Sequence, residues 1–109
     1  MENLNLQQLI SRRKQICDAI SEIPSMRRGT LNEVFRHQKL KDGTVATRGP
    51  FYNIIIKVGT KTVTTAIPKK DLDQIRREVQ NYKAFRALSD EYIDVCEQIS
   101  LLTFGGEKG

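Results

Sequence analysis

The chain has 109 residues, which is room for one domain with an arm and excludes a second catalytic domain. Hydrophobic residues make up 39% of the chain, enough for one modest core, whereas aromatic residues make up only 6%, so we expect no base-stacking platform. Two cysteines, Cys17 and Cys96, exclude a disulfide-rich scaffold and a CxxC motif and favour a reducing, cytoplasmic setting. No window resembles a signal peptide or a membrane span, so we expect neither.

The positive charge is concentrated in the middle of the chain. The formal net charge is +5 overall, and residues 1–24 sum to zero. Residues 25–88 hold fourteen basic and five acidic side chains, whereas residues 89–109 hold one basic and five acidic side chains. The middle segment therefore carries +9 and is the expected contact with a polyanion.

Residues 1–24 are predicted to form an N-terminal amphipathic helix that ends at Pro24. Its apolar residues follow a heptad seam, with Arg13 at the one polar position. The seam consists of Leu6, Leu9, Ile16, Ile20 and Ile23.

A β-hairpin is predicted around Gly59-Thr60, because two β-branched runs flank a two-residue turn that starts with glycine. In this register one face carries Tyr52, Ile54, Ile56, Val58, Val63 and Ile67. The opposite face carries Phe51, Asn53, Ile55, Lys57, Thr62, Thr64 and Ala66. Residues 30–38 are predicted as a third strand, and residues 40–50, which are rich in turn residues, as a loop.

Pro68 opens a second helical region, predicted as a helix over residues 69–87. The apolar stripe then shifts, so we predict a break near residues 87–89 with Ser89 as a new N-cap. A C-terminal amphipathic helix over 89–104 and a flexible tail over 105–109 follow. The apolar stripe of this C-terminal helical region is formed by Leu88, Tyr92, Val95, Ile99 and Leu102.

The elements together predict an α+β fold: a small three-stranded antiparallel sheet covered by one helix, with amphipathic helices on both sides. Residues 25–88 form the basic core domain of this arrangement. The seams of the outer helices can pair with each other, with a second copy of the chain in a dimer, or with a larger enzyme, and the sequence leaves these open. The seam residues are Leu6, Leu9, Ile16, Ile20, Val95, Ile99 and Leu102.

The inventory of reactive residues does not favour an enzyme. His37 is the only histidine, and the chain has no nucleophile elbow, Walker loop or metalloprotease motif. We therefore expect no catalytic residue, no metal and no cofactor. Cys17 and Cys96 lie beside the helix seams, where small buried hydrophobic residues are typical.

A nucleic-acid interface is the more specific of two hypotheses for the middle segment, residues 25–88. Its polar outer strand face suits hydrogen bonds to base edges, and a narrow β-ribbon fits the major groove of duplex DNA, which is about 12 Å wide. The candidate contacts are Arg27, Arg28, Arg36, Lys41, Arg48, Asn53, Lys57, Lys61, Thr62, Thr64, Lys69 and Lys70. The competing interpretation is an ordinary solvated strand face with solubilising charges.

Several short motifs resemble a family of small, uncharacterised prokaryotic proteins that occur beside transposases and other mobile elements. They are Met26-Arg27-Arg28-Gly29-Thr30-Leu31, Gly49-Pro50-Phe51-Tyr52, Ile67-Pro68-Lys69-Lys70-Asp71-Leu72 and Asn81-Tyr82 with Phe85. Many members of that family carry a cysteine cluster before the Gly-Pro-aromatic step, which implies a metal knuckle. Residues 39–48 here have no cysteine, so no metal is carried over.

A looser similarity links the chain to the three-stranded arm-binding domains of tyrosine recombinases. It rests on Lys41-Asp42-Gly43, Phe51-Tyr52, Val58-Gly59-Thr60-Lys61 and Pro68-Lys69, in that order. The resemblance implies a sheet that lies in the DNA major groove.

Two functions follow as hypotheses. The first is a non-enzymatic protein that binds duplex DNA and is associated with a mobile element; DNA is favoured over RNA as its partner, and the sequence leaves that choice open. The second is a protein-binding accessory or inhibitor subunit of a nucleic-acid enzyme.

Overall fold

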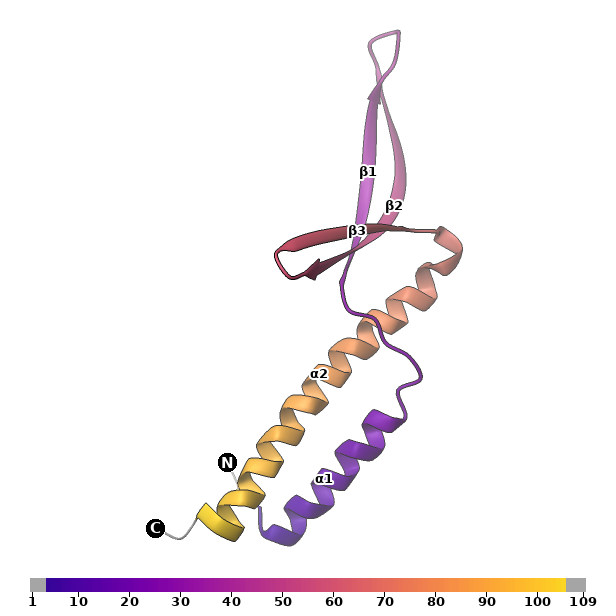
Figure 1. The fold of residues 1–109 in the computed structure, drawn as a ribbon. Coiled ribbons are helices and arrows are strands. Elements are labelled where there is room, and N and C mark those ends of the chain that lie inside the picture. Colours follow the sequence, from indigo (N-terminus) through magenta and orange to yellow (C-terminus); the bar gives the residue numbers. More distant parts are fainter. Residues whose placement is uncertain (1–3, 106–109) are drawn as a thin grey trace. The chain divides into compact units, whose positions relative to one another are not determined.

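A computed structural model describes residues 4–105 and has an α+β fold (Figure 1). The three strands form one antiparallel sheet in the order β1-β2-β3. The elements in chain order are α1 (Leu6–Ser21), β1 (Thr30–Lys39), β2 (Val45–Val58), β3 (Lys61–Ile67), a 3-10 turn η1 (Lys69–Asp71), α2 (Leu72–Ser100) and a π-helical turn η2 (Leu101–Gly105).

The chain divides into two units. Residues Met26–Tyr82, which we call the β unit, contain the sheet and the beginning of α2. The helical unit combines the chain up to Ser25 with the chain from Lys83 onward, so it contains α1 and the rest of α2. Each unit has its own apolar core.

The β2–β3 hairpin has the register that the sequence predicts. Val58 lies opposite Lys61 and Ile56 lies opposite Val63. Gly59 starts the turn with φ at 65°, in the left-handed region that favours glycine. The third strand, predicted over residues 30–38, is confirmed as β1.

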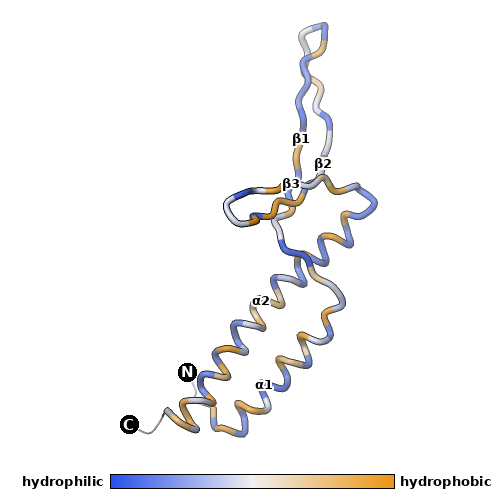
Figure 2. The backbone as a smooth tube through the Cα atoms, in the orientation of Figure 1, coloured by the Kyte–Doolittle hydropathy of each residue, from blue (hydrophilic) through white to orange (hydrophobic). Residues whose placement is uncertain are grey.

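The core of the β unit lies on one face of the sheet. Ile54, with 1% of its surface exposed, and Ile67 pack there with Ile75 and Val79 of α2. Gly29 comes close to this core, since a Cβ atom at that position would lie 2.6 Å from Cγ1 of Ile54. Figure 2 shows apolar positions, in orange, within the sheet, and the sequence of β2 includes the run Ile54-Ile55-Ile56.

The predicted apolar face is only partly covered. Val58 and Val63 share the face with Ile54, yet 60% and 46% of their surfaces are exposed. Both lie near the turn of the hairpin, beyond the part of the sheet that packs on Ile75 and Val79. The covering helix thus buries one end of this face and leaves the other end accessible.

The loop predicted over residues 40–50 is wrong from Val45 onward. Residues 45–48 pair with β1, and only Leu40–Thr44 form the connection. The register shifts where Gly49-Pro50 stands opposite Phe35 alone, which is a β-bulge. A bulge admits Gly and Pro inside a paired strand, so these turn residues do not end β2.

Helix α1 packs against α2 within the helical unit. The side chain of Asn5 accepts a hydrogen bond from the backbone N–H of Gln8, and the backbone N–H of Asn5 donates one to the side-chain oxygen of Gln8, which caps α1. The core contains Leu9, Ile16 and Val95, all at most 4% exposed. Leu4, Ile20, Leu88, Tyr92 and Ile99 are partly buried against it.

The two helix seams therefore pair with each other in this chain, one of the alternatives that the sequence left open. Two seam positions do not join the core, because Leu6 is 38% exposed and Leu102 is 56% exposed. An ion pair adds to the helix pairing: Nε and Nη2 of Arg12 donate to the two carboxylate oxygens of Glu91, both at 2.6 Å.

The break predicted near residues 87–89 is wrong, because α2 runs from Leu72 to Ser100 without interruption. A shift of the apolar stripe moves the packing face around a helix but costs no backbone hydrogen bond. Residues 72–100 contain no glycine or proline that would break the helix. Ser89 is accordingly an internal residue of α2.

Three smaller points concern the helical unit. Cys17 is exposed and Cys96 is intermediate in exposure, so the prediction of a buried Cys17 is wrong.

The predicted tail lies outside the described residues, apart from Gly105 in η2. Among the described helices, none is long and apolar enough to cross a membrane.

Candidate nucleic-acid interface

The sheet has one face that does not pack on α2, which we call the outer face. Side chains alternate between the two faces of a strand, so the register assigns each residue to a face. The outer face includes Asn32, Val34, Arg36, Arg48, Phe51, Asn53, Ile55, Lys57, Thr62, Thr64 and Ala66. Eight of these eleven side chains are exposed or at the limit of exposure, and Asn32, Asn53 and Ile55 are intermediate.

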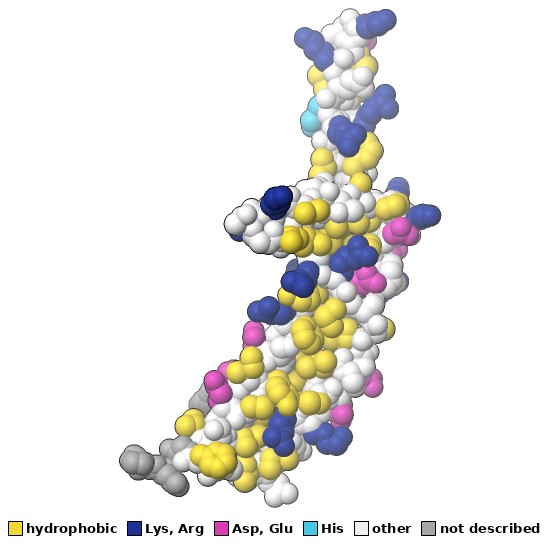
Figure 3. Space-filling view, in the orientation of Figure 1, with side chains coloured by type: hydrophobic (Ala, Val, Ile, Leu, Met, Phe, Trp, Pro, Cys, Tyr) yellow, Lys and Arg dark blue, Asp and Glu magenta, His cyan; other side chains and the backbone are white. Residues whose placement is uncertain are grey.

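Three cations lie along this face. Lys57 stands beside Thr62 on the β2–β3 hairpin, whereas Arg36 and Arg48 are direct cross-strand partners on the β1–β2 hairpin. Within residues 4–105, none of the three lies within ion-pair distance of a carboxylate. The dark-blue side chains in Figure 3 show Lys and Arg along the β1–β2 hairpin, at the top of the view.

Arg36 is held by an aromatic side chain. Its guanidinium carbon lies 4.5 Å above the centre of the Phe51 ring, a cation–π contact across β1 and β2. Phe51 lies opposite Val34, two residues before Arg36 on β1, so Arg36 and Phe51 are diagonal neighbours on this face, next to the bulge at Gly49-Pro50. The sequence predicts Arg36 as a contact and places Phe51 on this face, but it does not predict the stacking of the two side chains.

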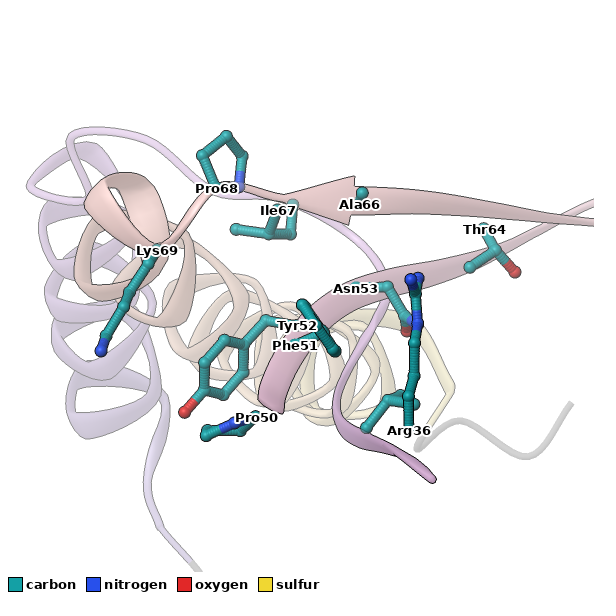
Figure 4. A pocket seen from close by; sticks show the side chains of 11 residues that line it. Arg36, Pro50, Phe51, Tyr52, Asn53, Thr64, Ala66, Ile67, Pro68 and Lys69 are labelled. Carbon is teal, nitrogen blue, oxygen red and sulfur yellow. The ribbon is translucent and has the colours of Figure 1, made fainter. Parts of the chain in front are cut away.

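A cavity of about 480 Å³ lies beside this stack, at the point where β3 ends (Figure 4). In Figure 4, Lys69 and Arg36 lie on opposite sides, with Phe51 and Tyr52 between them. The other lining residues are Val34, Pro50, Asn53, Thr64, Ala66, Ile67 and Pro68. Among the described residues that line the cavity, none is acidic.

The polar groups of the outer face differ in how far they are engaged. Asn53 accepts a hydrogen bond of 3.4 Å from the side-chain amide of Asn32, so its own amide nitrogen is left to donate elsewhere. Thr62 and Thr64 are exposed, and within the described part of the chain their hydroxyl groups have no hydrogen-bond partner. These three side chains lie together on the outer face, as predicted.

Other predicted contacts lie elsewhere. Lys61 is opposite Val58, which places it on the face that α2 covers, at the hairpin end. Arg27 is tied to α2, because its Nε lies 3.4 Å from Glu78 and its backbone N–H donates to the Glu78 carbonyl. Arg28 precedes β1 and Lys70 lies in η1; both are exposed.

Lys41 lies in the turn at the end of the β1–β2 hairpin, next to the one acidic residue of that turn. Thr44 donates two hydrogen bonds to Oδ1 of Asp42, from its hydroxyl at 2.6 Å and its backbone N–H at 3.0 Å. These bonds stabilise the ionised carboxylate and lower the pKa of Asp42. The single histidine, His37, lies on β1 and contacts the Thr47 hydroxyl.

The charge separates by unit. The β unit contains twelve Lys and Arg and five Asp and Glu residues, a net charge of +7, whereas the remaining residues sum to −2. Within residues 4–105, no group of three or more His, Cys, Asp or Glu side chains is arranged to hold a metal ion.

Comparison of the chain with models of protein families, with curated proteins and with solved structures finds no match.

Proposed function

We propose that the chain is a non-enzymatic protein that binds duplex DNA through the outer face of its β unit. The observation that carries the proposal is that this face is exposed and cationic, with no acidic residue on it, while the other face packs on α2. A polyanion attracts such a surface over a range set by the ionic strength. The mobile-element association rests on the sequence resemblance alone and stays a prediction.

The form of the sheet supports contact in the major groove. From Val45 to Phe51, β2 pairs with β1 but not with β3. This part of the sheet is a two-stranded ribbon that carries Arg36 and Arg48 on one face. A two-stranded ribbon fits the major groove, where base edges differ for every base pair. On the same face, in the three-stranded part of the sheet that adjoins the ribbon, Thr62, Thr64 and Asn53 supply hydrogen-bonding groups for contact with base edges.

The cations then divide into two roles. Arg36, Arg48 and Lys57 contact phosphates beside the groove, which positions the protein without reading sequence. Lys41 at the hairpin end and Lys69 after β3 extend this contact along the backbone. Arg27 has a structural role instead of a DNA contact, because its ion pair with Glu78 holds the segment that leads into β1 against α2.

The test is fluorescence anisotropy with a blunt labelled duplex at two salt concentrations. We expect binding at low salt and a loss of about a thousandfold in affinity on moving from 50 to 200 mM salt if about six phosphates are contacted. Absence of duplex binding at low salt contradicts the proposal.

A second candidate function is a protein-binding accessory of a nucleic-acid enzyme, and the end of the helical unit favours it. Leu101, Leu102 and Phe104 are between 56% and 74% exposed in and around η2. Exposed large apolar side chains in a group are typical of protein contacts. This candidate requires no DNA affinity, so the same anisotropy measurement separates the two.

A further inference from the structure

Strand β1 forms an open edge of the sheet. The strand order β1-β2-β3 gives β1 a partner on one side only, so every second residue of Thr30–Lys39 directs its backbone N–H and C=O groups away from β2. Within residues 4–105, no strand pairs with that side of β1. An unpaired row of backbone groups is a template for a further strand.

Among the open edges of this sheet, that of β1 is best suited to pairing. β3 has only seven residues and begins with Lys61, and the open edge of β2 contains Pro50, which has no N–H to donate. β1 has ten residues without Gly or Pro, and the extra residue of the bulge belongs to β2. From Glu33 to Lys39 every residue of β1 is exposed.

We propose that β1 pairs antiparallel with β1 of a second copy of the chain, with Phe35 opposite the partner's Phe35, so that the two chains form one continuous sheet. The two-fold axis of such a pair is perpendicular to the sheet and passes beside a residue that faces its own copy. The inference concerns the protein alone and goes beyond the proposed function, because it requires no DNA.

The side chains of β1 select this register. An axis at Phe35 places Glu33 opposite the partner's His37 on both sides of the axis, so the strand is complementary to itself. An axis at Glu33 or Arg36 would instead place two like charges directly opposite each other, which destabilises a strand pair. An axis at Val34 would place the Glu33 carboxylate against the partner's Phe35.

Glu33 and His37 each keep one polar atom for the partner. The Tyr52 hydroxyl donates to Oε2 of Glu33 at 3.4 Å, which leaves Oε1 to accept a hydrogen bond. Nδ1 of His37 lies 3.1 Å from the Thr47 hydroxyl, so Nε2 is the ring nitrogen that donates to the partner's Glu33. Both side chains are exposed in the single chain.

Phe35 supplies the apolar centre of the pair. Its ring lies next to Gly49, since a Cβ atom on Gly49 would be 3.2 Å from Cδ1 of Phe35. The ring nevertheless remains 47% exposed. Aromatic side chains that face each other across two strands stabilise the pairing, so the second Phe35 covers surface that water contacts in the single chain.

The helix seams do not provide this dimer contact. Leu9, Ile16 and Val95 are at most 4% exposed in the core that α1 and α2 form within one chain. These residues are therefore occupied, and a second copy of the chain needs another surface. The edge of β1 is such a surface within the β unit.

The first experiment locates the axis with single cysteines. Phe35→Cys, Val34→Cys and His37→Cys are each made in a Cys17→Ser/Cys96→Ser background whose circular dichroism matches that of the wild type. Oxidised glutathione is then added, and one thiol of each copy is oxidised to an intermolecular disulfide while the glutathione disulfide is reduced to two thiols. Non-reducing gels measure the rate at which linked dimer forms.

We expect Phe35→Cys to link at least about tenfold faster than the other two variants. Directly opposite Cα atoms are about 5 Å apart, within the reach of a disulfide. An axis at Phe35 separates the two Val34 positions by about 8 Å and the two His37 positions by about 14 Å, beyond the limit of about 7 Å.

The second experiment measures the dimer itself by sedimentation equilibrium under reducing conditions without DNA. Phe35→Lys removes the ring pair and places two ammonium groups opposite each other. Val63→Lys is the matched control, because Val63 is 46% exposed and lies on β3. We expect a wild-type dimer whose dissociation constant rises about tenfold or more in Phe35→Lys and stays unchanged in Val63→Lys.

Three results would overturn the inference. They are a wild-type protein that stays monomeric at its highest soluble concentration, fastest linking at Val34→Cys or His37→Cys, and a dimer that both lysine variants weaken equally or leave intact. None of these measurements contains DNA, so the binding of duplex DNA is decided separately.

Discussion

Arg36 and Arg48 face each other as direct cross-strand partners of β1 and β2 on the outer face of the sheet. Like charges directly opposite each other destabilise a strand pair. Within residues 4–105 no carboxylate lies within ion-pair distance of either guanidinium. This arrangement is unfavourable for the isolated β unit and favourable for a complex with a polyanion, which neutralises both charges.

Replacement of Arg48 by threonine should stabilise the β unit and weaken DNA binding together. The Arg48→Thr variant removes the repulsion, so we expect the free energy of unfolding to rise by about 0.2–1 kcal/mol. Urea unfolding at low ionic strength measures this, since guanidinium chloride would screen the charges. The Arg48→Lys variant keeps the charge and serves as the control. Equal stability of Arg48→Thr and the wild type would show that Arg36 and Arg48 do not repel each other measurably in the folded protein.

Lys57 should contribute one phosphate contact. The Lys57→Ala variant should lower the slope of log affinity against log salt concentration by about 0.9, the value for one neutralised phosphate of duplex DNA. Lys14→Ala is the matched control, because the Lys14 ammonium lies in the helical unit and pairs with Asp18 at 3.0 Å. If the slope of log affinity against log salt concentration changes in neither variant, or changes equally in both, DNA does not contact Lys57 on the outer face.

Thr62 should affect sequence discrimination more than overall affinity. The Thr62→Val variant keeps the shape and β-branching of the exposed side chain and removes only its hydroxyl. We expect stability to change by less than about 0.5 kcal/mol. Discrimination between preferred and altered duplexes should fall by about fivefold, the equivalent of one hydrogen bond. A uniform loss over all duplexes would assign Thr62 to backbone contact instead.

The Arg12–Glu91 pair predicts a pH-dependent stability of the helical unit. The hydrogen bonds from Arg12 lower the pKa of Glu91 below its ordinary value of 4.5. A carboxylate with a lowered pKa stabilises the folded state above its ordinary pKa, and this contribution is lost as the pH falls through the folded pKa. Both side chains are about two-fifths exposed, so solvent screening keeps the effect small.

The measurement is the Tm of the wild type and of Glu91→Gln between pH 7 and pH 3. We expect the variant to melt at a lower temperature at pH 7, with the difference closing below about pH 4.5 as the wild-type carboxylate takes up its proton. A difference that stays constant over this range would show that the charge of Glu91 does not contribute.

The sequence predicts the elements with a strong local signal and misses those set by tertiary packing. The Gly59 turn fixes the hairpin register, because glycine there adopts a positive φ and side-chain alternation then places every residue of β2 and β3. The break predicted at Ser89 came from a shift of the apolar stripe, which a continuous helix accommodates when different stretches pack on different partners.

The sequence predicts which residues of the β2–β3 hairpin lie on the outer face, but not the contact between Arg36 and Phe51. Arg36 and Phe51 lie on different strands, and their contact depends on the pairing of β1 with β2, in which Phe51 lies opposite Val34. Glycine followed by proline inside an alternating pattern is typical of a loop and also of a bulge, and the local pattern alone does not distinguish the two. The placement of Lys61 on the covered face follows from the predicted register itself, which pairs it with Val58.

The most direct test of the central claim is methyl NMR of the protein titrated with a blunt duplex. The methyl groups of Thr62 and Thr64 lie on the outer face, whereas those of Val58 and Val63 lie on the opposite face of the same hairpin. We expect the threonine signals to shift on binding and the valine signals to stay unchanged. Shifts confined to Val58 and Val63 would contradict the claim that DNA lies on the outer face.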